Sequence, residues 1–194
     1  LEGLQKVHSI LQVENDPLSR LDADARRRRD GLGVPGENGK AQIVHDQKLE
    51  VLDQLIEEAN GQPVLVFYNY KHELDRLQAR YPQAIHVKEE NVVKRWNAKE
   101  IPILLANPAS AGHGLNLQFG GHIAIWYSPT WNLEFFQQAN KRLHRRGQAE
   151  TVLIHTLMAK GTIDERIYDI VLRNKEAGQN ALLEAVKARI KEVT

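Results

Sequence analysis

The sequence has no cysteine, so it excludes a disulfide framework and any metal site built from thiolates. Long apolar runs are also missing. The longest runs, such as residues 101–106 with Pro102 inside it, fall far short of the roughly 20 residues that span a bilayer. The first ten residues do not place a basic stretch before an apolar one, as a secretory signal does. We therefore expect a cytoplasmic location and no membrane partner.

The sequence also has almost no net charge. The 194 residues carry 26 Lys and Arg against 25 Asp and Glu, so an attraction to nucleic acid would have to come from local clusters. One such cluster, residues 26–29, is four consecutive arginines, which suit either a phosphate contact or a solvated helix face. The chain begins with Leu1 rather than Met, so we expect it to be cut from a longer protein.

Short apolar runs alternate with helical patterns along most of the chain. The runs rich in strand formers are 64–68, 84–87, 101–106, 122–127 and 152–157, and the helical patterns are 47–60, 71–80, 89–98 and 133–143. Strands without strict alternation, separated by helices, indicate a parallel sheet covered on both faces. The sequence therefore predicts an α/β fold over residues 45–160. Residues 1–44 have turn-forming composition and are interpreted as an appendage or linker.

The last part of the chain, residues 161–194, is expected to form a C-terminal helical extension. Thr162 and Glu165 have the spacing of a capping box, which predicts that a helix begins there. A second amphipathic stretch follows at residues 182–190. Its apolar stripe suits packing against the core, and a partner-binding helix is the alternative.

Two segments carry the candidate chemistry. In residues 131–148, helical spacing would put Gln138, Arg142 and Arg145 on one face, where two guanidinium groups could hold a phosphate. A solvated basic face is the alternative. In residues 106–117, small residues follow a predicted strand end, where ligands of parallel sheets bind. A turn that merely needs glycine explains that segment as well.

Five segments, in order, resemble the C-terminal helicase lobe of the Swi/Snf-like branch of superfamily two. They are VLVFYNY at 64–70 (motif IV), SAGHGLNL at 110–117 (motif V), PTWN at 129–132, QANKRLHRRGQ at 138–148 (motif VI) and KGTIDERI at 160–167. The resemblance covers about residues 45–175 and is strongest to phage and prophage members, especially over residues 107–118. Departures are Ala111 in place of glycine, His113 in place of an apolar residue, and Leu133 in place of proline.

The resemblance implies a fold and a mechanism. In this family, ATP lies between two RecA-like lobes, and the first lobe supplies the phosphate loop and the Mg²⁺ ligands. The second lobe supplies arginines, which places Arg145 as the catalytic finger with Arg142 beside it. The other implied nucleotide-site residues are Gln138, Gly114 and Gln148, of which the two glutamines would orient the arginines. The implied DNA contacts, through phosphates of duplex DNA, are Asn69, Tyr70, Ser110, Gly112, Trp131 and Asn132.

The first half of such an ATP site is missing from this sequence. Residues 36–41 come nearest to a phosphate loop, but Val34 replaces the first glycine and Ala41 replaces the Ser or Thr that holds magnesium. We therefore expect the chain alone to be inactive and to bind no nucleotide tightly, with an N-terminal lobe of the same protein as its partner. The scattered histidines predict no metal site. The alternative function is a non-catalytic DNA-binding or scaffolding module. A stand-alone nucleotide enzyme is disfavoured by the missing loop.

Overall fold

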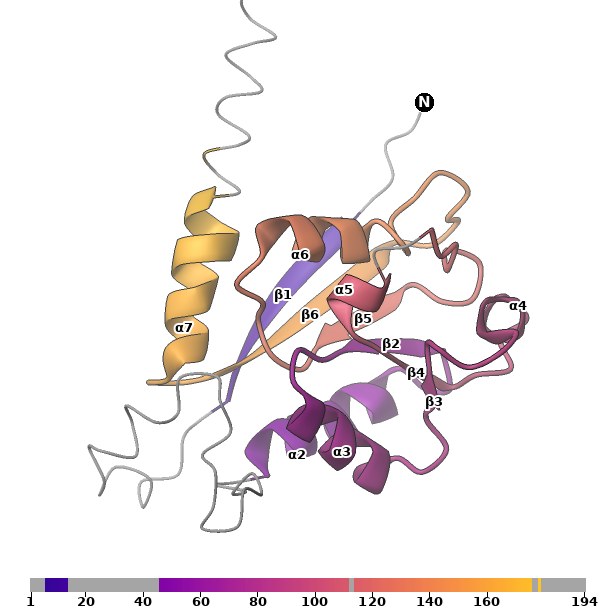
Figure 1. The fold of residues 1–194 in the computed structure, drawn as a ribbon, viewed down its shortest axis with the longest axis horizontal. Helices are drawn as coiled ribbons and strands as arrows, with labels where there is room; N and C mark the ends of the chain where they lie inside the picture. Colours follow the sequence, from indigo (N-terminus) through magenta and orange to yellow (C-terminus); the bar gives the residue numbers. More distant parts are fainter. Residues whose placement is uncertain (1–5, 14–45, 112–113, 176–177, 179–194) are drawn as a thin grey trace, which may run out of the picture.

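The computed structural model describes residues 6–13, 46–111, 114–175 and 178. Its six strands form one parallel sheet in the order β1-β6-β5-β2-β4-β3 (Figure 1). The strands are β1 Lys6–Val13, β2 Val64–Phe67, β3 Ile85–His86, β4 Ile103–Ala106, β5 Ile123–Trp126 and β6 Val152–Ala159. The predicted parallel sheet is confirmed, and the five predicted strand runs are β2 to β6.

Helices cover both faces of the sheet. They are α2 Gln47–Glu58, α3 Lys71–Arg80, α4 Val92–Asn97, α5 Pro108–Ala111, α6 Leu133–Asn140 and α7 Ile163–Ile167, which the π-helix η2 Tyr168–Lys175 continues. In Figure 1, α2 and α3 lie on one side of the sheet and α6 and α7 on the other. No helix in the described residues is long and apolar enough to cross a membrane.

The core consists of two layers, one on each face. Successive residues of β2 alternate between them: Leu65 and Phe67 join the cluster with α4, α6 and α7, while Val64 and Val66 join the cluster with α2 and α3. This alternation follows from the two-residue period of a strand. Because both layers are apolar, all four residues are buried, which is why the strand reads as a continuous apolar run.

Strand β1 is the main addition to the predicted architecture. It lies within residues 1–44, which the sequence analysis interpreted as an appendage or linker, and pairs with β6 over its full length, from Lys6 with Val152 to Val13 with Ala159. The remaining residues of that segment, including the four arginines at 26–29, lie outside the described residues. So does the predicted amphipathic stretch at 182–190.

Candidate functional site

The predicted site residues fall at two opposite edges of the sheet. Those assigned to DNA follow the carboxyl ends of strands: Asn69 and Tyr70 follow β2, Ser110 follows β4, and Trp131 and Asn132 follow β5. Those assigned to the nucleotide, Arg142, Arg145 and Gln148, lie in the connection between α6 and the amino end of β6. Gln138 lies on α6, and Gly114 lies between β4 and β5. Gly112 lies outside the described residues.

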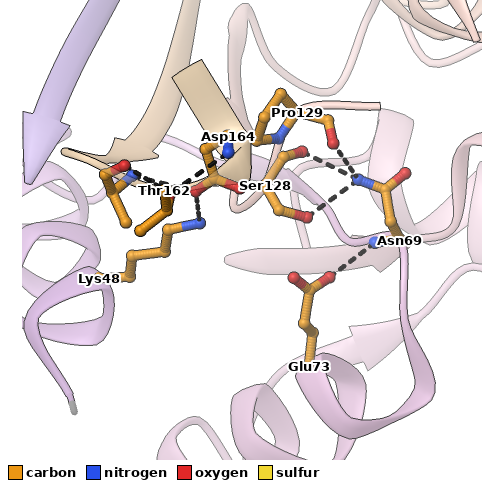
Figure 2. Close-up of polar contacts among 8 residues, drawn as sticks. Lys48, Asn69, Glu73, Ser128, Pro129, Thr162 and Asp164 are labelled. Carbon is orange, nitrogen blue, oxygen red and sulfur yellow. Dashed lines mark hydrogen bonds and ion pairs between the residues drawn. The ribbon is translucent and has the colours of Figure 1, made fainter. Parts of the chain in front are cut away.

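At the carboxyl edge, Asn69 ties the end of β2 to the loop after β5. Its side-chain Nδ2 donates to Ser128 O at 3.0 Å, Ser128 Oγ at 2.9 Å and Pro129 O at 3.1 Å (Figure 2). Asn107, after β4, donates from Nδ2 to the carbonyl oxygen of Asn69 at 3.2 Å. The amide of Asn69 is therefore engaged within the chain, and its position fixes the shape of this edge.

Helix α3 begins at the same place. The carboxylate of Glu73 accepts the backbone N–H of Asn69 at 2.8 Å and of Tyr70 at 3.1 Å, so it satisfies donors that the first turn leaves open. The Tyr70 ring is stacked on His72 at 5.5 Å between centroids. Burial and the negative charges of Glu73 and Asp164 raise the pKa of Tyr70, so its hydroxyl stays protonated and able to donate.

A second network at this edge involves the segment that matches the closing family signature. Asp164 Oδ2 accepts from Lys48 Nζ, on α2, at 2.5 Å and from the Ala159 N–H, at the end of β6, at 3.0 Å (Figure 2). The Thr162 hydroxyl donates to Ala159 O at 2.6 Å and accepts from Asp164 N–H at 3.2 Å. These contacts connect α7 to α2 and to the end of β6.

Helix α7 begins as the capping box predicts, with Thr162 as the N-cap. The partner of Glu165 differs from that of a regular box. Its carboxylate accepts the N–H of Gly161 at 3.1 Å, one residue before the cap. Gly161 has φ +71, which turns its N–H toward Glu165 and favours glycine at this position.

Trp131 is at the surface, with 48% of its area exposed. Trp131 is therefore not a core aromatic. Phe135, one helical turn later, is 36% exposed, so the two aromatic side chains mark the start of α6. Asn132 caps this helix, because its side-chain oxygen accepts from the Phe135 N–H at 3.1 Å.

The arginines of motif VI do not lie on a helix, which corrects the expectation of a shared helical face. Helix α6 ends at Asn140, whose buried side chain accepts from Trp126 Nε1 at 3.0 Å. From there the N–H groups of Arg142 and Leu143 bond three residues back rather than four. Leu143 is buried as expected, but Arg142 and Arg145 project from turns, and Gln138 remains on the helix.

Arg145 is exposed and donates from Nη1 to the side-chain oxygen of Asn116. Arg142 is half-buried, and burial together with the positive charge of Arg145 lowers its pKa. A nearby positive charge disfavours the charged form of a guanidinium group, which is the direction of this shift. Guanidinium groups are donors that suit phosphate oxygens.

The glutamines contact other groups than the arginines. Gln148 Nε2 donates to Gln118 O at 2.8 Å and to Gly121 O at 3.0 Å, which ties the motif VI turn to the segment before β5. Gln138 Nε2 donates to Glu134 Oε1 at 2.8 Å, on the same helix. Gly114 is exposed with φ +70, so its role in the turn accounts for the glycine.

Asn116, which contacts Arg145, is a candidate site residue that the sequence analysis did not name. It is the one polar side chain in residues 114–117, and that signal could have identified it. The structure reveals it because a turn brings Arg145 beside it, which helical spacing over residues 131–148 does not predict. The described residues contain no group of three or more His, Asp or Glu that could hold a metal ion.

Comparisons with known proteins agree with this architecture. The profile of the helicase conserved C-terminal domain matches residues 47–147, about half of the chain. Protein p41 of Acyrthosiphon pisum secondary endosymbiont phage 1 is 41% identical over 192 residues, which cover 93% of this chain and 41% of that protein. The chromatin-remodeling ATPase INO80 of Mycosarcoma maydis is 32% identical over 182 residues, which cover 84% of this chain and 9% of that protein.

A solved structure shares the fold. The crystal structure of the C-terminal part of the Fun30 ATPase domain matches with a TM-score of 0.58 at 24% identity, over 67% of this chain and 48% of that one. At this identity the likeness concerns the fold alone. The chain spans less than half the length of the two curated relatives.

Proposed function

The chain belongs to the helicase conserved C-terminal domain family, in its Swi/Snf-like branch, and from this premise we propose that it is the second motor lobe of an ATP-dependent DNA translocase. In this proposal an N-terminal lobe of the same protein binds ATP and Mg²⁺. The lobe of this chain completes that site with its Arg145 and Arg142. We propose residues 45–160 as the lobe and 161–194 as its helical extension, of which the structure describes the helical residues 163–175, while strand β1 from residues 1–44 widens the sheet.

The proposal rests on the pair of guanidinium groups at the amino edge of the sheet, where the strands begin. Arg145 is exposed, so a second lobe or a nucleotide can reach it, and its contact with Asn116 limits its range of positions. In the proposed mechanism Arg145 approaches the γ-phosphate and stabilises the negative charge that develops in the transition state. Arg142, whose pKa is lowered beside Arg145, holds the phosphate oxygens of the ground state.

In this proposal Gln148 and Gly114 affect the nucleotide site by setting the backbone path of the turns around it. Gln148 anchors the turn that carries Arg145, and Gly114 allows the turn before Asn116. Gln138, bonded to Glu134, faces the nucleotide only after a rotamer change. When bound, Mg²⁺ supplies charge neutralisation on the phosphates, and its ligands belong to the proposed first lobe.

DNA is proposed to bind at the opposite, carboxyl edge. Tyr70 and Ser110 offer hydroxyl donors there, and the exposed Trp131 and Asn132 extend the surface. A contact from Gly112, outside the described residues, stays a prediction. Asn69 shapes this edge, because its amide donates to Ser128 and Pro129. Contacts of this kind bind phosphates and sugars without reading sequence, as a translocase requires.

The test is substitution of Arg145 in the two-lobed protein. Arg145→Ala is expected to cut DNA-stimulated ATP turnover by about 10³-fold or more, with a much smaller change in nucleotide affinity. Arg145→Lys should rescue little, because an ammonium group cannot reproduce the guanidinium fork. Arg142→Ala should place a larger share of its loss in nucleotide binding.

Arg146→Ala is the matched control, since Arg146 is an exposed neighbour on the same turn. It should keep turnover near the parent rate. A folded Arg145→Ala protein that binds DNA and hydrolyses ATP at the parent rate would show that the lobe is a scaffold or that the finger is another residue.

A further inference from the structure

Helix α4 lies outside the motifs that carry the family resemblance, but its last turn holds motif V. Asn97 Nδ2 donates to the backbone oxygen of Asn116 at 2.9 Å. Trp96 Nε1 donates to the backbone oxygen of Leu117 at 2.8 Å. Two consecutive side chains of α4 therefore hold two consecutive carbonyl groups of the segment before β5.

Close packing fixes this arrangement. Trp96 is fully buried, and a Cβ at Gly120 would lie 2.3 Å from the Trp96 carbonyl oxygen and 2.4 Å from its indole nitrogen. Side chains larger than hydrogen cannot occupy that position without displacing one of the two segments. The end of α4 and residues 116–121 thus form one packed unit, and Asn116 projects from it.

Arg145 contacts this unit through Asn116. Its Nη1 donates to Asn116 Oδ1, while Gln148 of the same turn donates to Gln118 O. An exposed arginine without such a contact samples many rotamers, because its side chain has four rotatable bonds. A hydrogen bond from its charged group to a fixed acceptor restricts it to fewer positions.

We propose that Asn97 and Asn116 form a relay that sets the position of the Arg145 guanidinium. Asn116 acts through its side chain and Asn97 through the backbone of Asn116, so both are positioning residues. The restriction of Arg145 is a property of this chain, whereas its consequence for turnover rests on the proposed function. The experiment therefore measures the two separately.

The first measurement is the ¹⁵N order parameter of the Arg145 Nε–Hε group in this chain, with Arg146 as the internal reference. Asn116→Ala should lower the Arg145 value to that of Arg146. Asn97→Asp keeps the shape but removes the donor, and should lower it part of the way. Asn116→Asp keeps an acceptor oxygen and should retain order. Lys94→Ala, an exposed change on the same helix, is the matched control and should change nothing.

The second measurement is ATP turnover by the two-lobed protein. Asn116→Ala should lower kcat about tenfold, which is the scale of one charge-assisted hydrogen bond. Asn97→Asp should lower kcat about threefold. In both variants KM for ATP should change less than about twofold. A residue that only stabilised the fold would not divide kcat from KM in this way at temperatures below unfolding. Asn97→Ser replaces Asn97→Asp if the latter does not fold.

The outcomes separate the relay from the finger. An Arg145 that stays ordered in Asn116→Ala overturns the relay, and one that loosens in Asn116→Ala but not in the Asn97 variants overturns the role of Asn97. If Arg145 loosens in both and turnover is unchanged, the relay stands and the finger assignment falls.

Discussion

At the scale of single residues, the exposed aromatic side chains distinguish the two edges of the sheet. Trp131 and Phe135 lie where β5 leads into α6, at the edge proposed for DNA. Phe119, which is 57% exposed, lies just before β5 and against Gly147, at the edge proposed for the nucleotide. Large exposed aromatics are uncommon on a solvated surface, and they often mark contact sites.

Trp131→Ala tests the DNA edge. We expect it to weaken binding of duplex DNA about fivefold, or ~1 kcal/mol, because a large contact surface is lost. The slope of log affinity against log salt should not change, since no charge is removed. Fluorescence anisotropy over a salt series measures both quantities.

Phe119→Ala is the control for this prediction, because it removes a similar exposed ring at the opposite edge. It should leave DNA affinity unchanged. Equal losses from the two substitutions would indicate a general effect on the lobe, and no loss from Trp131→Ala would remove that residue from the DNA surface.

At the scale of elements, the contact between α4 and the Gly120–Gly121 turn leaves no room for a Cβ at Gly120. We expect Gly120→Ala to lower the free energy of unfolding by about 3 kcal/mol, because its Cβ would meet Trp96 backbone and side-chain atoms at 2.3 and 2.4 Å. Urea denaturation measures the loss as a lower midpoint with an unchanged slope.

Gly61→Ala provides the comparison. Gly61 has φ +81 but no atom within 4 Å of an added Cβ, so the substitution carries only the conformational cost of about 1 kcal/mol. If both variants lost the same stability, the packing of Trp96 against Gly120 would not be the cause.

The elements also show how far the sequence predicts this fold. The strands β2, β4 and β5 follow from apolar runs, because both faces of the sheet are covered and no polar residue interrupts them. The end of α6 does not follow. The apolar spacing continues to Leu143, which is buried, although the backbone has already left the helix at Asn140. The turn buries Leu143, as a continued helix would also have done. The apolar spacing in the sequence is therefore the same in both cases and does not distinguish them.

The candidate site was predictable only where a motif names its residues. Arg142 and Arg145 were proposed from their spacing and from the resemblance, but the contact of Arg145 with Asn116 depends on the turn. Strand β1 was missed because half of its residues are polar and because it belongs to the N-terminal segment whose residues 31–39 have turn-forming composition. Its pairing with β6 is a tertiary contact between the two ends of the fold.

At the scale of the whole molecule, the proposed function makes this chain one of the two lobes of an ATP-dependent motor. The two guanidinium groups reach an edge of the lobe, whereas the sequence contains no Gly-x-x-x-x-Gly-Lys-Ser/Thr loop to hold the phosphates they would approach. Each half of such a site binds weakly, because the phosphates and their metal need donors from both lobes at once.

We therefore expect the purified 194-residue chain to hydrolyse no measurable ATP, with or without DNA, while still binding duplex DNA weakly. The physical reason is that an arginine finger stabilises charge on a phosphate that another group must already hold. A coupled phosphate-release assay measures turnover, and the Arg145→Ala chain serves as the blank for contaminating ATPases. DNA-stimulated turnover that the parent chain shows and Arg145→Ala lacks would mean that this chain contains a complete site. Turnover equal in the two would identify a contaminant, and its absence in both, with DNA binding intact, is the result that a half-site predicts.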